Sequence, residues 1–547
     1  MNKYIDPKEF VQSIDNSFWK YITKQGLIRD VVDFNDLRKE EFLYEIAREI
    51  NRGSYRPSVA KIIGFPKNHG VIRPVLHFSL SDIIIYYYCV KSIQDQLIEK
   101  INCVEFVFGG FKITDKLVLC ETNVDGLIYD SCYEYFLRHS FRKAWSDYQN
   151  LAKSLSEGGF DYYMHLDVAH FYDAIPLNKL EQEVRSVVPH RKNVIDLLFY
   201  LLKNIKTVDN YSYTENIVGL PQEEVGEMSR LLANFYLNYF DEKIIDELKE
   251  LLGDSKGSDW QYTRYADDLW FAFRGEKSEA LRITQIVSRL LSDISLHLNE
   301  SKTKIMTSME YSEYWCFSDW EYIVDYGKDK DRIFAKLKDL YGRRNSGCRW
   351  FSPFNYSLKK ICSLEFDDDI FVCNADFFIQ AIMDNPLLLK GGNRDLIRLL
   401  IMLFKADDEY KIRMLDFLNG TSVMYPLVSF VLWDAFLSYP YCEEVYKSLL
   451  KKYYSEKWRD LWWYERCLFL RYYIEKKIYD FDEIGLEKLL VHLGNRSEYI
   501  SDYERRYVIR LLVRLPDQKG LELLNSKYSE NKDRRLIEYL KNDKKKK

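Results

Sequence analysis

A pair of adjacent aspartates inside an otherwise apolar run constrains this chain most. The run extends from Gln261 to Phe273, and aromatic or aliphatic residues flank Asp267 and Asp268 on both sides. Such a run predicts two buried β-strands joined by a tight turn, with both carboxylates at its tip. Adjacent carboxylates repel each other unless a cation lies between them, and Mg²⁺ is the usual cation for hard oxygen ligands. An isolated Asp-Asp pair more often marks a solvated turn, so the metal-site interpretation needs further acidic residues.

A second apolar run supplies the next carboxylate. Residues 162–167 predict a strand that ends in Asp167, and an aromatic pair and Pro176 precede a predicted helix. A site for phosphoryl transfer with two metal ions needs a carboxylate from such a second strand. Here the chain resembles a reverse transcriptase. Asp167 matches the first catalytic aspartate of the palm, and the tetrapeptide at 265–268, Tyr-Ala-Asp-Asp, matches the YxDD box of that family.

The resemblance implies a DNA polymerase that adds dNTPs by two-metal phosphoryl transfer. It implies that Asp167, Asp267 and Asp268 are catalytic. It also implies that these carboxylates and the backbone of Val168 bind two Mg²⁺ ions, for which Mn²⁺ can substitute. Tyr265, directly before the box, would lie near the primer end.

A basic hairpin is predicted upstream of the palm. Residues 62–75 show a strand–turn–strand pattern in which Lys67 and Arg73 flank the turn. The pattern resembles the fingers hairpin of reverse transcriptases, which presents cations to the incoming triphosphate. Arginine offers a bidentate fork and lysine a point charge to phosphate oxygens. Without the palm motifs, an ordinary basic hairpin would be the preferred interpretation.

Three further residues match positions that bind the dNTP in the family. Tyr172 lies five positions after Asp167, where the resemblance implies an aromatic steric gate that excludes the 2′-OH of a ribonucleotide. Gln222 and Lys302 match dNTP-binding positions in the loop before the template-gripping helix and in the last palm motif. Core packing is the alternative for Tyr172, and a solvated side chain at a strand start is the alternative for Lys302.

The loop before the template-gripping helix departs from the family pattern. Glu223 and Glu224 stand where intron-type and retroviral members usually place glycine after Pro-Gln. Two carboxylates near a nucleic-acid backbone would repel its phosphates. This departure favours unusual templating, including template-independent synthesis primed by a tyrosine of the protein. Tyr44 and Tyr21 in the predicted N-terminal helices are candidate priming residues, with ordinary packing as the alternative for each.

The chain as a whole predicts an α+β fold. Right-hand polymerase fingers and palm are followed by an all-α, HEAT-like helical-repeat domain. The predicted parts are an N-terminal helical extension (1–60), reverse-transcriptase fingers and palm (61–310), a thumb-like connector (311–370), the helical-repeat domain (371–541) and a disordered basic tail (542–547). Because no crisp sequence period is visible in the fourth part, an irregular helical bundle is its alternative.

Composition limits the classes of partner and location. The net charge of -5 argues against a uniformly basic nucleic-acid binder but allows a local basic groove. The 10 cysteines form no CxxC pair, which predicts reduced thiols and a cytoplasmic protein. No signal-peptide pattern and no apolar run of membrane-spanning length is present, so no membrane partner is expected.

A compact palm followed by a long helical region resembles the prokaryotic abortive-infection and defence-associated reverse transcriptases. This resemblance implies a role in antiphage defence, homo-oligomeric assembly and a DNA product, made in some members from a non-coding RNA. Two alternatives stay open. One is a retron-like enzyme that copies a dedicated non-coding RNA into cDNA, and the other is a catalytically silent scaffold whose helical solenoid binds a partner protein.

Overall fold

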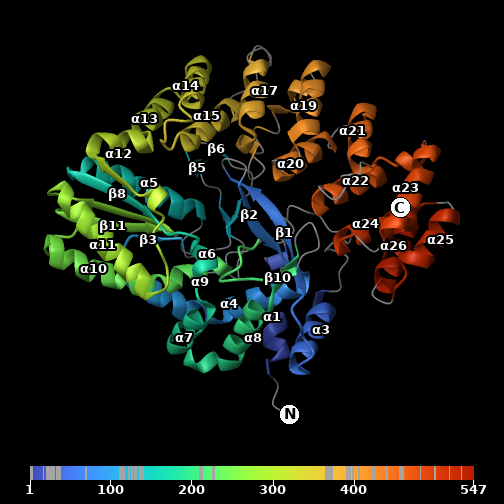
Figure 1. Ribbon diagram of the computed structural model, residues 1–547, viewed down its shortest axis with the longest axis horizontal. Coiled ribbons are helices and arrows are strands. Elements are labelled where there is room, and N and C mark those ends of the chain that lie inside the picture. Colours follow the sequence, from blue (N-terminus) through green and yellow to red (C-terminus); the bar gives the residue numbers. More distant parts are fainter. Residues whose placement is uncertain are drawn as a thin grey trace.

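The computed structural model gives the arrangement in Figure 1, where the sequence runs from blue to red. It describes residues 4–15, 18–19, 31, 39–67, 71–109, 118–120, 123–124, 127–128, 132–134, 141–208, 214–224, 228–363, 374–389, 396, 399–400, 402–404, 407–421, 426–437, 442–454, 461–480, 482–497, 500–515, 518–530 and 533–546. Tyr21, one of the two predicted priming residues, lies outside these ranges. Within the described part of the chain, no helix has the length and apolar character needed to cross a bilayer.

The predicted fingers hairpin is present. Strand β1 (Val59–Pro66) pairs antiparallel with β2 (Ile72–His77), as the pattern over residues 62–75 predicts. Two short strands, β9 (Lys206–Val208) and β10 (Thr214–Asn216), extend the hairpin to a sheet of order β10-β9-β1-β2. Two two-stranded sheets lie between the fingers and the palm in the sequence: β4 (Val118–Cys120) with β7 (Cys132–Glu134), and β5 (Asn123–Val124) with β6 (Leu127–Ile128).

One apolar helix is central to the N-terminal half. Helix α4 (Leu80–Ile101) begins after Ser79, whose hydroxyl accepts a hydrogen bond from the backbone N–H of Asp82. Residues 83–90 are all buried, so this stretch is covered on every side rather than along one stripe. The helices packed on it are α1 (Pro7–Ser13), α7 (Leu177–Val187), α8 (Lys192–Asn204) and α9 (Met228–Tyr236), and α3 (Lys39–Asn51) packs on α1.

The palm is a five-stranded sheet of order β13-β8-β12-β11-β3. Its strands are β3 (Val107–Phe108), β8 (Tyr162–Asp167), β11 (Trp260–Tyr265), β12 (Asp268–Phe273) and β13 (Lys304–Thr307). The three strands predicted around the aspartates are therefore confirmed, and the central neighbours β8, β12 and β11 run antiparallel. The edge strand β3 pairs parallel with β11.

The two faces of the palm sheet differ in composition, because successive strand residues point to opposite sides. The inner face carries Met164, Leu166, Leu269 and Phe271, which belong to the largest hydrophobic core. It packs against α10 (Asn238–Leu252) and α11 (Lys277–Asp293). The aromatic face consists of Tyr163, Tyr265, Trp270, Tyr148, Tyr311 and Trp315. The last three of these residues come from α5 (Phe141–Glu157) and α12 (Ser308–Trp315), which cover this face.

A buried ion pair lies under the inner face. The guanidinium of Arg264 donates from Nε to Oδ1 of Asp241 at 2.8 Å, and the two side chains are 0% and 1% exposed. The hydroxyl of Tyr262 donates to the same carboxylate at 2.6 Å. Nη1 of Arg264 also donates to the carbonyl oxygen of Ala266 at 2.9 Å. The pair therefore connects α10 to the turn that carries the two adjacent aspartates.

The C-terminal part is helical, as predicted, and forms an arc beside the fingers (Figure 1). Its helices are α13 (Phe317–Asp325), α14 (Lys330–Gly342), α15 (Phe351–Ser363), α17 (Ala375–Asp384), α19 (Asp408–Thr421), α20 (Pro426–Leu437), α21 (Glu443–Tyr454), α22 (Trp463–Glu475), α23 (Glu483–Arg496), α24 (Asp502–Arg514), α25 (Gln518–Lys527) and α26 (Arg534–Lys546). One row of contacts runs α20–α22–α24–α26 and a second runs α17–α19–α21. Alternate helices therefore stack on each other; a HEAT-like repeat stays a prediction.

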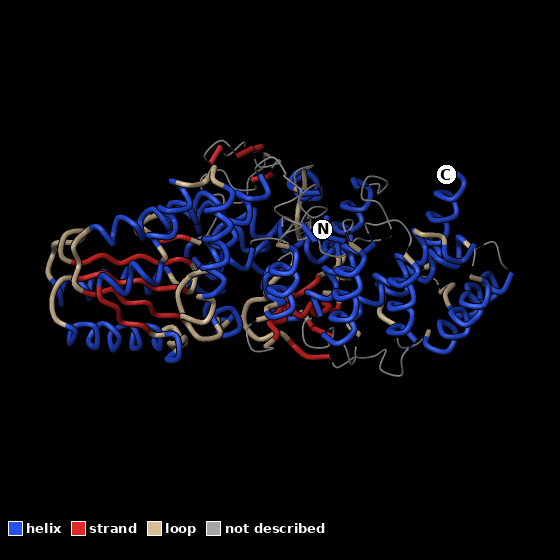
Figure 2. The backbone as a smooth tube through the Cα atoms, turned by 90° about the horizontal axis from the view of Figure 1, so that it is seen from above, coloured by secondary structure: helices blue, strands red, loops and turns tan. Residues whose placement is uncertain are grey.

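The fingers sheet shares its core with this helical part. Figure 2 shows the two larger sheets apart from each other, with the palm strands at one end and the fingers strands in the middle of the molecule beside the C-terminal helices. Ile63 of β1 belongs to the hydrophobic core of the C-terminal helices. The indole N–H of Trp463 donates to the carbonyl oxygen of Ile62 at 2.9 Å. A Cβ on Gly64 would lie 3.0 Å from the ring of Trp462, so the backbone of β1 approaches α22 closely.

Helix α11 ends at Asp293, and the chain then reverses through Ser295, which has a φ of 63°. Two boundaries differ from the sequence prediction. The predicted palm boundary at residue 310 falls inside α12, which packs on β8 and β13. Helix α26 continues through Lys546, so residues 542–546 form its last turns where a disordered tail was expected.

Candidate active site

The three predicted catalytic aspartates meet at one end of the palm sheet. Asp167 is the last residue of β8, Asp268 is the first residue of β12, and the two lie opposite each other in the antiparallel register. Asp267 occupies the turn between β11 and β12. The backbone N–H of Val168 donates to the carbonyl oxygen of Asp267 at 3.3 Å, which ties the end of β8 to this turn.

The turn is held from its outer side by β3. Ala266 has a φ of 52°, a left-handed conformation that is uncommon for alanine. Its N–H donates to the carbonyl oxygen of Phe108 at 3.1 Å. A Cβ on Gly109, which has a φ of 108°, would lie 2.9 Å from the nitrogen of Ala266. Only glycine allows the edge strand to approach the catalytic turn this closely.

Asp167 is buried and already has two hydrogen-bond donors. Nζ of Lys302 donates to its Oδ1 at 2.8 Å, and the side-chain amide of Asn299 donates to its Oδ2 at 3.0 Å. The backbone N–H of Asn299 also donates to the carbonyl oxygen of Asp167 at 2.8 Å. Lys302, predicted from its position to bind dNTP, therefore reaches the catalytic end of the sheet and pairs with a carboxylate there.

Asp267 is the least compensated of the three carboxylates. Burial, together with the negative charges of Asp268 and Asp167, raises its pKa to about 6. No side chain of another described residue donates a hydrogen bond to it. A carboxylate in this situation is stabilised by a cation, so Asp267 and Asp167 fit a divalent ion chemically. Among the described residues, no three or more His, Cys, Asp or Glu side chains are gathered as a metal site.

Asp268 differs from its neighbour because both of its oxygens face basic side chains. Nε2 of His165 lies 2.7 Å from Oδ1, and the guanidinium of Arg349 lies 3.5 Å from Oδ2. Burial alone would raise the pKa of Asp268. The hydrogen bond and charge of His165 and the charge of Arg349 outweigh burial and lower the pKa below its usual value.

One cation of the fingers hairpin, Lys67, interacts with the catalytic carboxylates. Burial and the charges of Arg73 and Lys302 lower the pKa of Lys67, while Asp267 and Asp167 oppose this shift. Lys67 therefore interacts electrostatically with the residues at the end of the palm sheet. Its backbone N–H donates to the carbonyl oxygen of Val71 at 2.7 Å and so closes the described base of the hairpin turn. The prediction that Lys67 and Arg73 bind the dNTP stays a prediction.

Tyr172 and Gln222 are held by backbone contacts around the same site. The carbonyl oxygen of Tyr172 accepts a hydrogen bond from the N–H of Leu220 at 2.8 Å. A Cβ on Gly219 would lie 2.3 Å from that carbonyl oxygen, so this approach requires glycine. The carbonyl oxygen of Gln222 accepts from the N–H of Leu76 at 2.7 Å, which joins the loop to β2. The half-buried ring of Tyr172 packs against the main core.

Glu223 and Glu224 point into the protein, which removes the reason for expecting them to repel a template. Glu223 is half-buried and accepts a hydrogen bond from the N–H of Ser229 at 2.8 Å, at the start of α9. Glu224 forms an ion pair with Nδ1 of His77, and its side chain is only 4% exposed. The two carboxylates stabilise the loop and its junction with β2.

The predicted primer-end and priming tyrosines lie in different places. Tyr265 is 9% exposed, and its ring centre is 5.1 Å from those of Trp145 and Tyr148 in the aromatic face. Tyr44 is half-buried on α3, which packs on α1 and lies away from the palm sheet in Figure 1. The structure therefore brings Tyr265 to the catalytic turn but does not bring Tyr44 there.

Sequence reasoning missed His165, Asn299 and Arg349. His165 could have been found, because it lies two positions before Asp167 and therefore on the same face of the strand. Asn299 directly follows the apolar run before Lys302, but its contact with Asp167 depends on how the chain reverses after α11. No local signal identifies Arg349, which comes from a loop between two helices outside the palm.

Comparisons with known proteins agree with this geometry. Residues 128–330 match the family described as reverse transcriptase (RNA-dependent DNA polymerase). The match contains β8, β11, β12 and β13 and excludes the fingers hairpin. These residues therefore carry a reverse-transcriptase domain.

A curated relative is the "Putative COX1/OXI3 intron 1 protein" of Saccharomyces cerevisiae, which is 20% identical over 311 residues. The similarity covers 49% of this chain and 33% of the relative, so the chain spans about a third of the relative's length. Similar solved structures include apo telomerase from Candida tropicalis, with a TM-score of 0.33, 12% identity and coverage of 81% of this chain and 73% of that one. Telomerase from Candida albicans with a fragment of telomeric RNA has a TM-score of 0.34, 8% identity and coverage of 72% and 67%.

Proposed function

We propose that this chain is a DNA polymerase of the reverse-transcriptase type that adds dNTPs to a 3′ end. The single observation that carries the proposal is the register of the palm sheet, which places Asp268 opposite Asp167 and Asp267 in the adjoining turn. The reverse-transcriptase domain over residues 128–330 supports it.

Asp167 and Asp267 would hold divalent cations, with Asp268 and the backbone of Val168 completing the predicted ligand set. The raised pKa of Asp267 supports this assignment, because a bound cation would offset the repulsion among the three carboxylates. Mg²⁺ held by these residues would supply the positive charge that activates an attacking 3′ oxygen and offsets the charge on the pyrophosphate leaving group.

The cations around the site would bind the triphosphate. Lys67 and Arg73 of the fingers hairpin supply positive charge opposite the carboxylates, and their mutual repulsion would be offset by phosphate oxygens. Lys302 pairs with Asp167. We expect its ammonium group to move to a phosphate oxygen once a cation compensates Asp167.

Tyr172 would select deoxynucleotides by the bulk of its ring. The contact of Gly219 and Leu220 with its backbone fixes the position of this residue. Tyr172→Ala should raise incorporation of ribonucleotides relative to deoxynucleotides, whereas Tyr172→Phe should keep the discrimination because it keeps the ring. Equal discrimination by the alanine variant and the wild type, measured with matched dNTP and rNTP pairs, would show that Tyr172 only packs.

An RNA template is the preferred substrate. The inward positions of Glu223 and Glu224 leave no electrostatic reason to expect that a template is repelled. Template-independent, protein-primed synthesis is the alternative, and copying of one dedicated non-coding RNA is a special case of templated synthesis.

The test is incorporation of labelled dNTPs with Mg²⁺, with and without an added RNA template and DNA primer. RNase or protease is applied to separate samples of the enzyme beforehand. Asp267→Asn should lower incorporation by roughly three orders of magnitude or more, and the exposed control Asp254→Asn should not change it. Product that depends on the added RNA supports templated synthesis, whereas RNase-resistant DNA attached to protein supports protein priming. Incorporation that survives Asp267→Asn would contradict the proposed site.

Antiphage defence and homo-oligomeric assembly are further parts of the proposal. They are supported by the architecture, a palm followed by a long series of stacked helices. Cells that express the wild-type protein should show a lower efficiency of phage plating than cells that express Asp267→Asn. Equal protection by both proteins would favour a scaffold over an enzyme.

A further inference from the structure

The fingers hairpin packs against two different hydrophobic cores. At its base, Ala60 of β1 and Leu76 of β2 are buried in the main core, which also contains α4. Farther along β1, Ile63 is fully buried in the hydrophobic core of the C-terminal helices, and Phe65 packs against that core. Lys67 directly follows β1. The half of β1 that lies nearest to Lys67 therefore packs on the C-terminal helices.

One side chain of α22 contacts both strands of the hairpin. Trp463, the first residue of α22, is 4% exposed, and its indole N–H donates to the carbonyl oxygen of Ile62 on β1 at 2.9 Å. Its ring centre lies 5.4 Å from that of His77 on β2 and 5.3 Å from that of Tyr503 on α24. The rings of His77 and Tyr503 are themselves 4.6 Å apart, so three aromatic rings meet where the hairpin joins the helices.

The contact with β2 extends to the loop that carries Gln222. Nδ1 of His77 hydrogen-bonds to the carboxylate of Glu224. The backbone N–H of Glu224 donates to the carbonyl oxygen of Leu76 at 2.9 Å, and the N–H of Leu76 donates to the carbonyl oxygen of Gln222 at 2.7 Å. A displacement of the hairpin would therefore also displace this loop.

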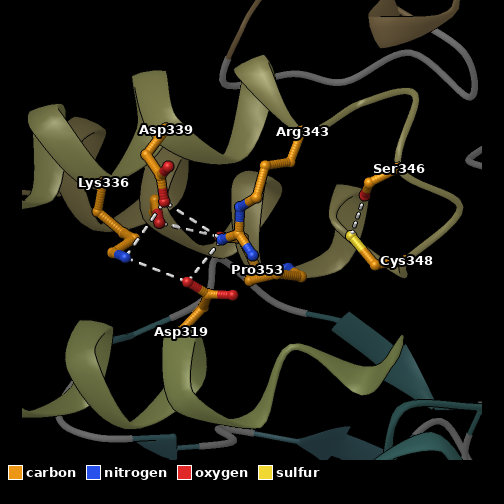
Figure 3. Close-up of polar contacts among 8 residues, drawn as sticks. Asp319, Lys336, Asp339, Arg343, Ser346, Cys348 and Pro353 are labelled. Atoms are coloured by element: carbon orange, nitrogen blue, oxygen red, sulfur yellow. Dashed lines mark hydrogen bonds and ion pairs between the residues drawn. The ribbon is translucent and has the colours of Figure 1, made fainter. Parts of the chain in front are cut away.

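The same helical part is fixed to the palm at its other end. Phe317, the first residue of α13, packs in the hydrophobic cluster of the aromatic face, whereas Ile323 of the same helix belongs to the core of the C-terminal helices. Figure 3 shows Asp319 of α13 between Lys336 and Arg343 of the α14 region, and its Oδ1 accepts from their side chains at 3.1 and 2.6 Å. Because the carboxylate is buried and bonded to two cations, it fixes α14 on α13.

We propose that the C-terminal helices hold the fingers hairpin in place relative to the palm, and that Trp463 is a positioning residue for dNTP binding. The helices are attached to the palm through α13 and to the hairpin through α22, so they set the distance between Lys67 and the catalytic carboxylates. Trp463 holds the backbone from which Lys67 reaches the triphosphate and makes no contact with the nucleotide itself. This inference rests on the proposed polymerase function.

The first test follows the hairpin without catalysis. Amide hydrogen exchange of the full-length protein is measured by mass spectrometry for the wild type, Trp463→Phe and Trp463→Ala. The phenylalanine variant keeps a ring but loses the N–H donor, so exchange in residues 59–66 and 71–77 should become about 3- to 10-fold faster, while exchange in α4 stays unchanged. The alanine variant should show a larger effect, because it also loses the ring contacts. Wild-type exchange of the hairpin in both variants overturns the inference.

Tyr528→Phe is the matched control for the phenylalanine variant. The hydroxyl of buried Tyr528 donates to the carbonyl oxygen of Leu493 at 2.9 Å, so this substitution also removes one hydrogen bond from an aromatic side chain to a backbone carbonyl. Its hairpin exchange should match that of the wild type. If the control speeds hairpin exchange as much as Trp463→Phe does, the effect is a general loosening of the C-terminal helices and Trp463 has no specific role.

The second test asks whether Trp463 acts through Lys67. Trp463→Phe should raise the KM for dNTP about 3- to 10-fold and change kcat less than about twofold, because the cation that it positions contributes to binding of the triphosphate. In a Lys67→Ala background, the same substitution should change the KM less than about twofold, because that cation is already absent. Equal factors in the two backgrounds contradict the positioning role. If wild-type incorporation is insensitive to Asp267→Asn, the proposed function fails, whereas the exchange measurement still decides whether Trp463 holds the hairpin.

Discussion

The two faces of the palm sheet differ in how their buried polar groups are paired. On the inner face, Arg264 and Asp241 neutralise each other at essentially zero exposure, and Tyr262 donates to the same carboxylate. On the aromatic face, the described residues offer no hydrogen-bond partner to the hydroxyl of Tyr148, the indole nitrogen of Trp270 or Nδ1 of His165, all of which are buried. Unpaired buried polar atoms lower stability.

The two faces therefore have different roles in the protein. The inner face holds the sheet together, and its ion pair also fixes the carbonyl of Ala266 in the catalytic turn. The unpaired polar atoms of the aromatic face lower stability, and they lie among the groups around Asp268. Strain and unpaired polar atoms are common at functional sites.

Removal of the inner-face carboxylate should give the largest loss of stability. Asp241→Ala leaves the guanidinium of Arg264 buried without its partner, so we expect the free energy of unfolding to fall by about 3–5 kcal/mol. The neighbouring variant Glu242→Ala breaks the exposed pair with Lys100, whose members are 44% and 37% exposed, and the hydrogen bond that the side-chain amide of Asn238 donates to Glu242. It should cost about 1 kcal/mol. Urea denaturation followed by tryptophan fluorescence compares the two. Similar losses would mean that the buried pair is not what stabilises the inner face.

Neutralising Asp267 and neutralising Asp268 should change the stability of the fold in opposite directions. The pKa of Asp267 is raised to about 6 in the folded protein, so its ionisation destabilises the fold as pH rises from about 4 to 6, and this cost stays above pH 6. Without divalent metal, Asp267→Asn should therefore raise stability by about 1–3 kcal/mol at pH 8 and have little effect at pH 3.5.

Asp268→Asn is the control for that prediction. The pKa of Asp268 is lowered in the folded protein, so its ionised form adds stability at neutral pH that is lost as the pH falls through the folded pKa. This variant should lower the Tm at pH 8, with an effect that shrinks in acid. Thermal unfolding at the two pH values decides the signs, and a shift of the same sign for both variants would contradict the distinction between the two carboxylates.

A smaller effect should distinguish matched tryptophans on the two faces. The indole N–H of Trp260, on the inner face, donates to the carbonyl oxygen of Gly253 at 2.7 Å, whereas that of Trp270 finds no acceptor in the part of the chain that the structure describes. Both substitutions to phenylalanine remove similar ring volume, so Trp260→Phe should cost about 1 kcal/mol more than Trp270→Phe. If both substitutions lower the free energy of unfolding equally in urea denaturation, the difference in hydrogen bonding between the two faces does not affect stability.

Much of the site could be predicted because its signals are local. The strand that ends in Asp167, the paired strands around Asp267 and Asp268, and the hairpin that carries Lys67 and Arg73 all follow from apolar runs interrupted by turn residues. The direction of Glu223 and Glu224 could not be predicted in the same way. Their partners are a backbone N–H at the start of α9 and a histidine on β2, and adjacent carboxylates in a loop give no sign of either.

The sequence by itself determined which carboxylates come together, because strand ends and the turn between paired strands fix their positions within a few residues. Only the tertiary structure decided how each carboxylate is compensated. Lys302 and Asn299 reach Asp167, His165 and Arg349 reach Asp268, and Asp267 keeps the raised pKa. The physical reason is that an ion pair depends on distances of a few ångströms between side chains, and the chain sets those distances only after distant helices have packed.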